Sequence, residues 1–483
     1  MANVIGERES VAGEFTGSEL GDRRLDERLV TIAKRLEKRP DAGFPEAMVT
    51  DAETEAFYRF VRNPRATFEA VLKPHIKATL ARCSQAPVVL AVHDSSEFRF
   101  TGSEQREGLG CLGQSGQGFL GHFTLAVAPG EVRDPLGVLH VEKLVREKGK
   151  MTKTQLRRKH KASYTALRHV ETEQMRWHRG VTASVETAGE LAEKLIHLMD
   201  SEADDYSLLS HLISLRQRFV VRMTYDRVLA PDETGESRLK DALNGKPVVV
   251  KREVHLARRG RHAGGNSRKR NPQREERDAV LEVRVAKLTL RRPSTALRSL
   301  PPTLPINVVH VLERGNPPDT VPVEWILATT EPIATREQIL TVVDYYRARW
   351  VIEEFFKALK TGCAFEKRQL ESAQTLYVAL ALLVPVAWRL LRLRVLGRLE
   401  PDAPAHQALG TIELQVLRGV MKSELRRDLS ENPTVGEVML AVAKLGGHLR
   451  SNGPPGWLVL GRGYMRLQDY VSGYLIARDV INP

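Results

Sequence analysis

Three acidic residues lie where carboxylates could act together on a phosphate ester. Asp94 ends the apolar run PVVLAVHD (87–94), and Asp200 ends the apolar run LIHLMD (195–200). A side chain at the end of a strand projects from the sheet edge into a cleft, and Glu353 lies in a segment of helical periodicity. Two-metal phosphodiester chemistry needs hard oxygen ligands on rigid elements, with the ions ~3.5–4 Å apart. The pattern fits such a site, although three carboxylates among 60 acidic residues are weak support alone.

A polar stripe on the helix predicted from about Ile339 to Lys360 strengthens this interpretation. Tyr346, Arg349, Glu353 and Lys360 fall within about 60° of one another at ~100° per residue. Much of the remaining circumference is apolar, which is typical of a buried helix, and buried charges must be satisfied inside a site. The structural alternative is an ion pair between Arg349 and Glu353 with Tyr346 as a packing residue. That alternative leaves the complete stripe unexplained.

The region from about 16 to 68 is predicted to be helical, with a basic face. Asp22 offers an N-cap before a segment whose leucines and isoleucine recur at helical spacing, and a second basic helix ends before Pro64. The candidate DNA contacts on these helices are Arg23, Arg24, Arg28, Arg59 and Arg62. A charged face is often only solvated, so DNA contact is one of two interpretations here.

Elements further along the chain change in type. Residues 70–210 have an α/β pattern, with neighbouring strands expected in GHFTLAVAP and GVLHVEKL. Between about 217 and 332 the apolar period is two, which predicts antiparallel strands. Within that sheet the basic loop 258–274 is either a linker or a hairpin loop lying along DNA. Beyond 335 the chain is predicted to be helical to its end.

Composition favours a polyanionic partner. The 483 residues carry a net charge of +13, and neutralising phosphates releases counterions. A basic protein without a nucleic-acid role remains the alternative. The longest apolar stretch, Leu376–Trp388, contains Pro385 and is shorter than the ~20 residues of a spanning helix. The N-terminal residues lack the pattern of a signal peptide, so no membrane association and a cytoplasmic location are expected.

The segment YRARWVIEEFFKALKTG resembles a known signature. It matches Y-x2-R-x3-E-x6-K of the bacterial cut-and-paste insertion-sequence transposases without a spacing error, at Tyr346, Arg349, Glu353 and Lys360. Other segments are also similar to this family, namely LGDRRLDERL (20–29), YRFVRNP (58–64), VHDSSEF (92–98), DSEAD (200–204), RFVVR (218–222), VEWILATTEP (323–332) and AKLGGHL (443–449). The basic loop and the C-terminal tail depart from the family pattern.

The resemblance implies a fold and a division into domains. The expected fold is α/β, a ribonuclease-H-like catalytic core with an inserted antiparallel β-sheet, flanked by helical N- and C-terminal regions. The expected domains are a DNA-end-binding domain at 1–69, a catalytic domain at 70–369 with its insertion at about 217–332, and a dimerisation domain at 370–483.

The resemblance also implies roles for the site residues. Asp94, Asp200 and Glu353 would bind two Mg²⁺ ions, with Mn²⁺ as the alternative. Tyr346, Arg349 and Lys360 would hold phosphates, and Arg222 is a further candidate phosphate ligand. Trp325 would stack on a base flipped out of the DNA, unless it is simply a core tryptophan.

The implied activity is excision of a mobile element through a DNA hairpin, followed by joining of its 3′ ends to a target. The expected partners are double-stranded DNA, both transposon ends and target, and a second copy of the chain in a synaptic complex. The expected location is the bacterial cytoplasm, in association with the nucleoid. The alternatives are a catalytically silent DNA-binding regulator and a stand-alone metal-dependent nuclease.

Overall fold

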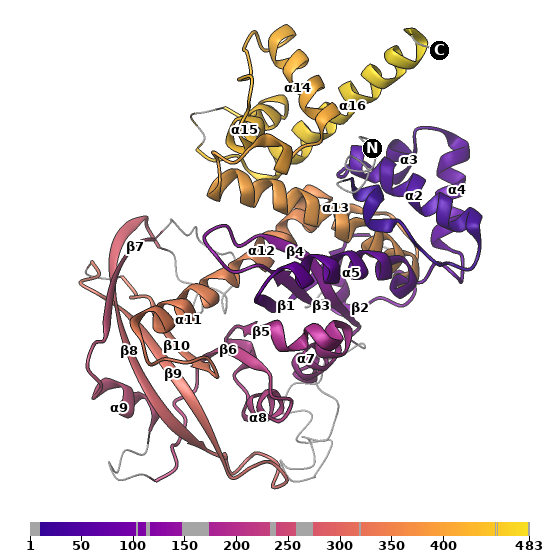
Figure 1. The fold of residues 1–483 in the computed structure, drawn as a ribbon. Coiled ribbons are helices and arrows are strands. Elements are labelled where there is room, and N and C mark those ends of the chain that lie inside the picture. Colours follow the sequence, from indigo (N-terminus) through magenta and orange to yellow (C-terminus); the bar gives the residue numbers. More distant parts are fainter. Residues whose placement is uncertain are drawn as a thin grey trace. The chain divides into compact units, whose positions relative to one another are not determined.

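A computed structural model describes residues 10–102, 105–112, 116–146, 173–231, 238–256, 274–317, 320–449, 451 and 453–481 (Figure 1). The chain forms two compact units. Unit 1 comprises Met1–Thr152, Glu186–Leu191 and Trp350–Pro483, and unit 2 comprises Lys153–Val185 and Ala192–Arg349. The basic loop 258–274 lies, except for its last residue, outside the described residues.

Unit 1 contains a group of antiparallel strands. Strand β3 (Gly116–Val127) pairs with β1 (Val89–Phe100), β2 (Gly110–Leu112) and β4 (Pro135–Leu144). Helix α5 (Phe68–Gln85) packs against β4. The two strands expected in 121–129 and 137–144 are therefore confirmed as neighbours.

The length of β1 corrects one prediction from the sequence. The strand does not end at Asp94 but continues for six residues, so Asp94 lies in mid-strand opposite Phe123 of β3. The continuation alternates polar residues with Phe98 and Phe100, both of which are buried. This alternation is itself a strand pattern, and it extends β1 past the apolar run.

Helices from both ends of the chain pack together in unit 1. The N-terminal elements are η1 (Val11–Phe15), α2 (Arg23–Lys38), α3 (Phe44–Met48) and α4 (Asp51–Val61). Asp22 caps α2 by accepting a hydrogen bond from the Arg24 amide, as the sequence predicts. The C-terminal elements are α13 (Ala373–Leu399), η7 (Ala405–Gln407), α14 (Thr411–Ser423), α15 (Val435–Leu445) and α16 (Trp457–Ile481). Helices α13 and α16 both contact α2.

Helix α13 is longer than the sequence suggested, because it continues through Pro385 to Leu399. By length and composition it could cross a membrane, yet 83% of its most apolar window is buried inside the structure. The core helix of a folded domain passes the same test, so this is weak evidence for a span. Packing on most sides compensates the hydrogen bond that a proline removes from a helix.

Unit 2 is built on a mixed sheet with the strand order β5-β6-β10-β9-β8-β7. The strands are β5 (Leu195–Met199), β6 (Arg218–Met223), β7 (Val250–Leu256), β8 (Arg277–Arg291), β9 (Thr303–Arg314) and β10 (Glu324–Thr329). Strands β5 and β6 are parallel, and the pairs β6–β10, β10–β9, β9–β8 and β8–β7 are antiparallel. The antiparallel strands predicted between 217 and 332 are confirmed.

Helices cover this sheet and close its core. Helices α7 (Met175–Ala188), α8 (Tyr206–Ser214) and α9 (Leu239–Asn244) contribute buried residues to one hydrophobic cluster with the strands. Helix α11 (Arg336–Ala348) packs against β6 and β9. The molecule is thus mixed α/β with helices at both ends, as predicted. The ribonuclease-H-like topology and the domain boundaries at 69/70 and 369/370 stay predictions.

Candidate active site

The segment that carries the polar stripe is not one regular helix, which corrects the sequence prediction. Helix α11 ends at Ala348, Arg349 is its C-cap, and α12 (Trp350–Lys357) follows. A π-helical turn, η5 (Ala358–Gly362), then contains Lys360. The boundary between the two units falls between Arg349 and Trp350. A helical wheel with ~100° per residue therefore does not describe the positions of all four residues. Tyr346 and Arg349 belong to unit 2, and Glu353 and Lys360 belong to unit 1.

In unit 1, Asp94 and Glu353 are carried by elements that pack on one another. Helix α12 packs against β1. Its Phe355 and Phe356 rings lie 5.7 and 5.4 Å from the ring of Phe123, the residue opposite Asp94 on β3. The Ser95 amide donates a 2.7 Å hydrogen bond to Oδ1 of Asp94. A shared aromatic layer thus fixes the backbone that carries both carboxylates.

Lys360 is anchored to the same strand as Asp94. Its ammonium donates a hydrogen bond to the carbonyl oxygen of Glu97 and lies 5.1 Å from the centre of the Phe98 ring. The carboxylate of Glu366 is 3.5 Å from the Lys360 nitrogen. Burial lowers the pKa of Lys360, and the neighbouring Glu366 opposes that shift.

In unit 2, Asp200 lies directly after β5, as the sequence predicts. Its Oδ1 accepts a 2.8 Å hydrogen bond from the Glu202 amide and caps the short 3-10 helix η4 (Ser201–Ala203). Strand β5 is parallel to β6 with Met199 opposite Val221, so Asp200 follows the end of β5 while Arg222 still lies within β6. The carboxylate and the guanidinium therefore come from adjacent strands.

Tyr346 and Trp325 join this group. The ring of Tyr346 meets that of Trp325 edge to face, with centroids 5.3 Å apart. Burial raises the pKa of Tyr346, which is also sensitive to the charges of Arg349, Arg222 and Asp200 and to a hydrogen bond with Arg222. Unit 2 thus gathers five residues predicted from the sequence. Trp325 is only half-buried, which a base-stacking role requires and a purely core role does not.

A positioning residue that the sequence reasoning missed is Asp204, whose side chain is fully buried. It accepts hydrogen bonds from the amides of Thr224 and Tyr225 at 2.6 and 2.8 Å, and from Nε of Arg227 at 3.0 Å. These contacts tie the turn that begins at Asp200 to the end of β6. The signal was available in DSEAD, where two aspartates four residues apart follow one strand.

The predicted N-terminal contacts lie on α2, α4 and the turn after α4, where all are exposed except the half-buried Arg28. Arg24, Arg28 and Arg59 line one shallow hollow between the two helices. Arg23 and Arg59 each pair with a glutamate of their own helix, and Arg62 pairs with Glu371. Exposed pairs of this kind are worth little energy, so these guanidiniums can exchange a carboxylate for a phosphate at small cost.

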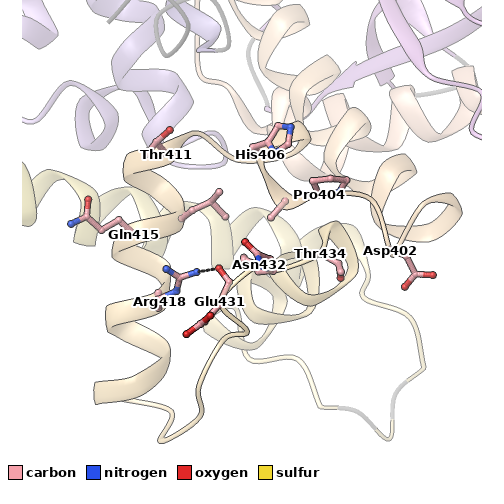
Figure 2. Close-up of a pocket in the computed structure, with 12 residues that line it drawn as sticks. Asp402, Pro404, His406, Thr411, Gln415, Arg418, Glu431, Asn432 and Thr434 are labelled. Atoms are coloured by element: carbon pink, nitrogen blue, oxygen red, sulfur yellow. Dashed lines mark hydrogen bonds between the residues drawn. The ribbon is translucent and has the colours of Figure 1, made fainter. Parts of the chain in front are cut away.

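A larger pocket of about 420 Å³ lies elsewhere in unit 1, between α14 and the loop before α15 (Figure 2). Arg418 reaches across it and donates a 2.8 Å hydrogen bond to the carbonyl oxygen of Glu431. None of the predicted site residues lines this pocket. This pocket is therefore separate from the predicted site residues.

The metal ligands predicted from the sequence are divided between the units, two carboxylates in unit 1 and one in unit 2. Among the described residues, no group of three or more His, Cys, Asp or Glu within one cluster could hold a metal ion. Joint metal binding by Asp94, Asp200 and Glu353 stays a prediction. Their chemistry is suitable, since all three supply hard oxygen donors.

Comparison with known proteins defines the class of protein. A family model described as "Transposase DDE domain" matches residues 146–387, and one described as "Transposase DNA-binding" matches residues 8–66. The first match spans half of the chain, so the chain belongs to the DDE transposases. It includes Asp200 and Glu353 but begins after Asp94.

Among solved structures, the chain is similar to a piggyBac transposase synaptic complex with hairpin DNA. The identity is 9%, 97% of this chain and 79% of that chain are covered, and the TM-score is 0.33. Likeness at this level does not define a common fold. The family match is the stronger finding, and it makes the protein a metal-dependent enzyme of DNA cleavage and transposition that binds DNA.

Proposed function

We propose that this transposase excises a mobile element through a DNA hairpin intermediate and joins the freed 3′ ends to target DNA. The observation that carries the proposal is the grouping around Asp200 in unit 2. A carboxylate, a guanidinium (Arg222), a buried phenol (Tyr346) and a half-exposed indole (Trp325) form one set. The carboxylate suits a metal ion, the guanidinium and the phenol suit a phosphate, and the indole suits a base.

Asp94, Asp200 and Glu353 would hold two divalent ions, Mg²⁺ or Mn²⁺. Backbone amides orient one oxygen of Asp94 and one of Asp200, which favours rigid ligands of the kind that octahedral Mg²⁺ demands. When bound, the ions would activate a water or a 3′-hydroxyl of the DNA as nucleophile and would neutralise charge on the leaving oxygen. This fit rests on the donor chemistry of the three carboxylates.

The remaining residues would grip the DNA near the cleavage point. Tyr346 stays a neutral hydrogen-bond donor at physiological pH, because burial raises the pKa of its phenol. Arg349 and Arg222 offer forked donors for phosphate, and Lys360 a point charge. Trp325 would stack on a base that leaves the helix as the hairpin forms.

The wider organisation follows from the same proposal. Helices at 1–69 would read the transposon ends through Arg23, Arg24, Arg28, Arg59 and Arg62, and helices at 370–483 would join two copies into a synaptic complex. The catalytic core would have ribonuclease-H-like topology. The protein would act in the bacterial cytoplasm, at the nucleoid.

Cleavage of a defined substrate tests the proposal. Purified protein is incubated with Mg²⁺ and a linear fragment that carries the terminal repeats of its element. Wild-type protein is expected to give hairpin-ended products. Glu353→Ala is expected to bind the fragment normally and to give none, because the change removes a metal ligand and no positive charge.

The same assay separates the alternatives. Binding by the wild-type protein without cleavage supports a silent regulator and contradicts the proposal. Cleavage of fragments without terminal repeats at the same rate supports a stand-alone nuclease. The matched control is Glu354→Gln, which lies next to Glu353 but pairs with Arg394 and Lys357 inside unit 1.

A further inference from the structure

Five charged side chains gather beyond the active-site part of β1, and four of them lie outside the predicted DNA contacts. Glu97 and Arg99 come from β1, Arg146 follows β4, Lys360 belongs to η5, and Glu366 to the 3-10 helix η6 (Phe365–Lys367). We call these residues the β1-end cluster. Each side chain is partly exposed, between 20% and 55%. The cluster is therefore reachable from solvent.

The carboxylate of Glu97 lies between two guanidiniums. Its Oε1 is 2.6 Å from Nη1 of Arg146, and its Oε2 is 2.8 Å from Nη2 of Arg99. Burial alone raises the pKa of Glu97, but the hydrogen bonds from Arg99 and Arg146 outweigh it and lower the pKa. Proteins also bind phosphates in this way, with one anionic group that accepts hydrogen bonds from two arginines.

A second carboxylate, that of Glu366, joins the cluster. Its Oε1 accepts a 2.8 Å hydrogen bond from the Arg99 amide and lies 3.5 Å from the Lys360 nitrogen. Arg99, Arg146 and Lys360 thus bring three cationic side chains to one partly exposed place. Cations grouped in this way attract anions.

The side chains stand on a rigid base. The rings of Phe98 and Phe100, on the same strand as Glu97, each lie 5.4 Å from the ring of Phe365. The backbone at Arg146 is packed closely against β2. A Cβ at Gly110 of β2 would lie 2.1 Å from the carbonyl oxygen of Arg146, so only glycine permits this close packing. The backbone that carries the arginines is therefore fixed before any ligand arrives.

We propose that the β1-end cluster binds a backbone phosphate of DNA, and that Glu97 occupies the place of this phosphate in the DNA-free protein. The inference rests on the proposed function, since it assigns a further contact to the strand that is cleaved. Glu97 follows Asp94 by three residues on a regular strand, so the two side chains leave opposite faces of β1. The link to the active-site residues is Lys360, whose ammonium donates a hydrogen bond to the carbonyl oxygen of Glu97. DNA entering the site exchanges a carboxylate for a phosphate on Arg99 and Arg146.

Two substitutions with opposite expected signs test the exchange. The affinity of the full-length protein for a labelled duplex oligonucleotide is measured without metal at several salt concentrations. Arg99→Ala is expected to weaken binding and to reduce the slope of log affinity against log salt by about one, for one lost phosphate contact. Glu97→Gln is expected to strengthen binding, because no anion then has to be displaced.

A purely structural cluster gives a different result. In that case both variants unfold at lower temperature, and Glu97→Gln does not gain affinity. Arg427→Ala, which removes the same charge from the exposed loop after α14, is the control and should leave the salt slope almost unchanged. An unchanged slope in Arg99→Ala, or no gain in Glu97→Gln, overturns the proposal. If Arg99→Ala does not fold, the gain in Glu97→Gln still decides.

The outcome is independent of catalysis. Absence of cleavage by the wild-type protein in Mg²⁺ would contradict the proposed function and leave the metal-free salt slopes intact. Normal cleavage together with unaltered slopes would contradict only the phosphate site.

Discussion

The two units hold the predicted site residues in different ways. In unit 1, Asp94 and Lys360 are fixed to one strand, and the helix with Glu353 packs on that strand through phenylalanine rings. In unit 2, Asp200 lies among an indole, a phenol and guanidinium groups. Unit 1 thus offers mainly charges on rigid backbone, while unit 2 offers aromatic rings beside charged groups.

This difference shows how little spacing along the chain says about spatial grouping. Tyr346 and Glu353 are seven residues apart, yet they belong to different units. Arg222 and Tyr346 are more than a hundred residues apart and share a hydrogen bond. A motif that is continuous in sequence therefore serves two structural bodies, and we expect substitutions in each to have distinct signatures.

The largest expected effect is a loss of cleavage activity when the aspartate of either unit is removed. Asp94→Ala and Asp200→Ala should each lower the rate of strand cleavage by at least on the order of 10²–10³-fold, the loss typical of a group that stabilises the transition state. Nicking of an end-bearing fragment in Mg²⁺ measures this, with the exposed Asp278→Ala as control. Near wild-type activity in either variant would show that the aspartate of that unit is not needed for cleavage.

A second change targets stability in unit 2 alone. Asp204→Asn should lower the free energy of unfolding by about 3 kcal/mol, because it breaks a buried ion pair with Arg227. Urea denaturation measures this loss. Asp205→Asn, at the N-cap of α8, is the neighbouring control and should cost about 1 kcal/mol or less. Equal losses in the two variants would show that Asp204 does not hold the turn after Asp200.

The next effect separates base stacking from core packing at Trp325. If the indole stacks on a base, Trp325→Ala should slow hairpin formation by about 10–100-fold, for ~1–3 kcal/mol of stacking. Initial nicking should change much less, and Trp325→Phe should retain most of the rate. Single-turnover analysis of nicked and hairpin products resolves the steps. A core role predicts instead that every step slows equally and that stability falls.

A final effect is a pH dependence of stability that arises in the strand leading to Asp200. Burial lowers the pKa of His197 from 6.5 to about 4. Between these values the unfolded chain binds more protons than the folded one, so stability is complete above pH 6.5 and is lost as the pH falls towards 4. Urea denaturation from pH 7 to 4 should show a shallower decline for His197→Gln than for the wild-type protein. Identical slopes would contradict this assignment.

Much of the local structure was predictable because it depends on short-range patterns. Asp22 caps α2 and the apolar residues of that helix face inward, as helical periodicity predicts. The alternation in 277–291 and 303–314 gives two long paired strands. The prediction that a strand ends at Asp94 was wrong. It took the end of the apolar run as the end of the strand, whereas polar residues and the buried Phe98 and Phe100 continue β1.

By itself, the sequence determined the types of element and the residues capable of metal and phosphate chemistry, since these depend on periodicity and on side-chain type. Tertiary structure alone decided which of them meet. The interruption at Arg349 and the π-helical turn that contains Lys360 are not predicted by a uniform helical period. The β1-end cluster likewise joins residues 97, 99, 146, 360 and 366, whose approach is set by strand pairing and an aromatic base.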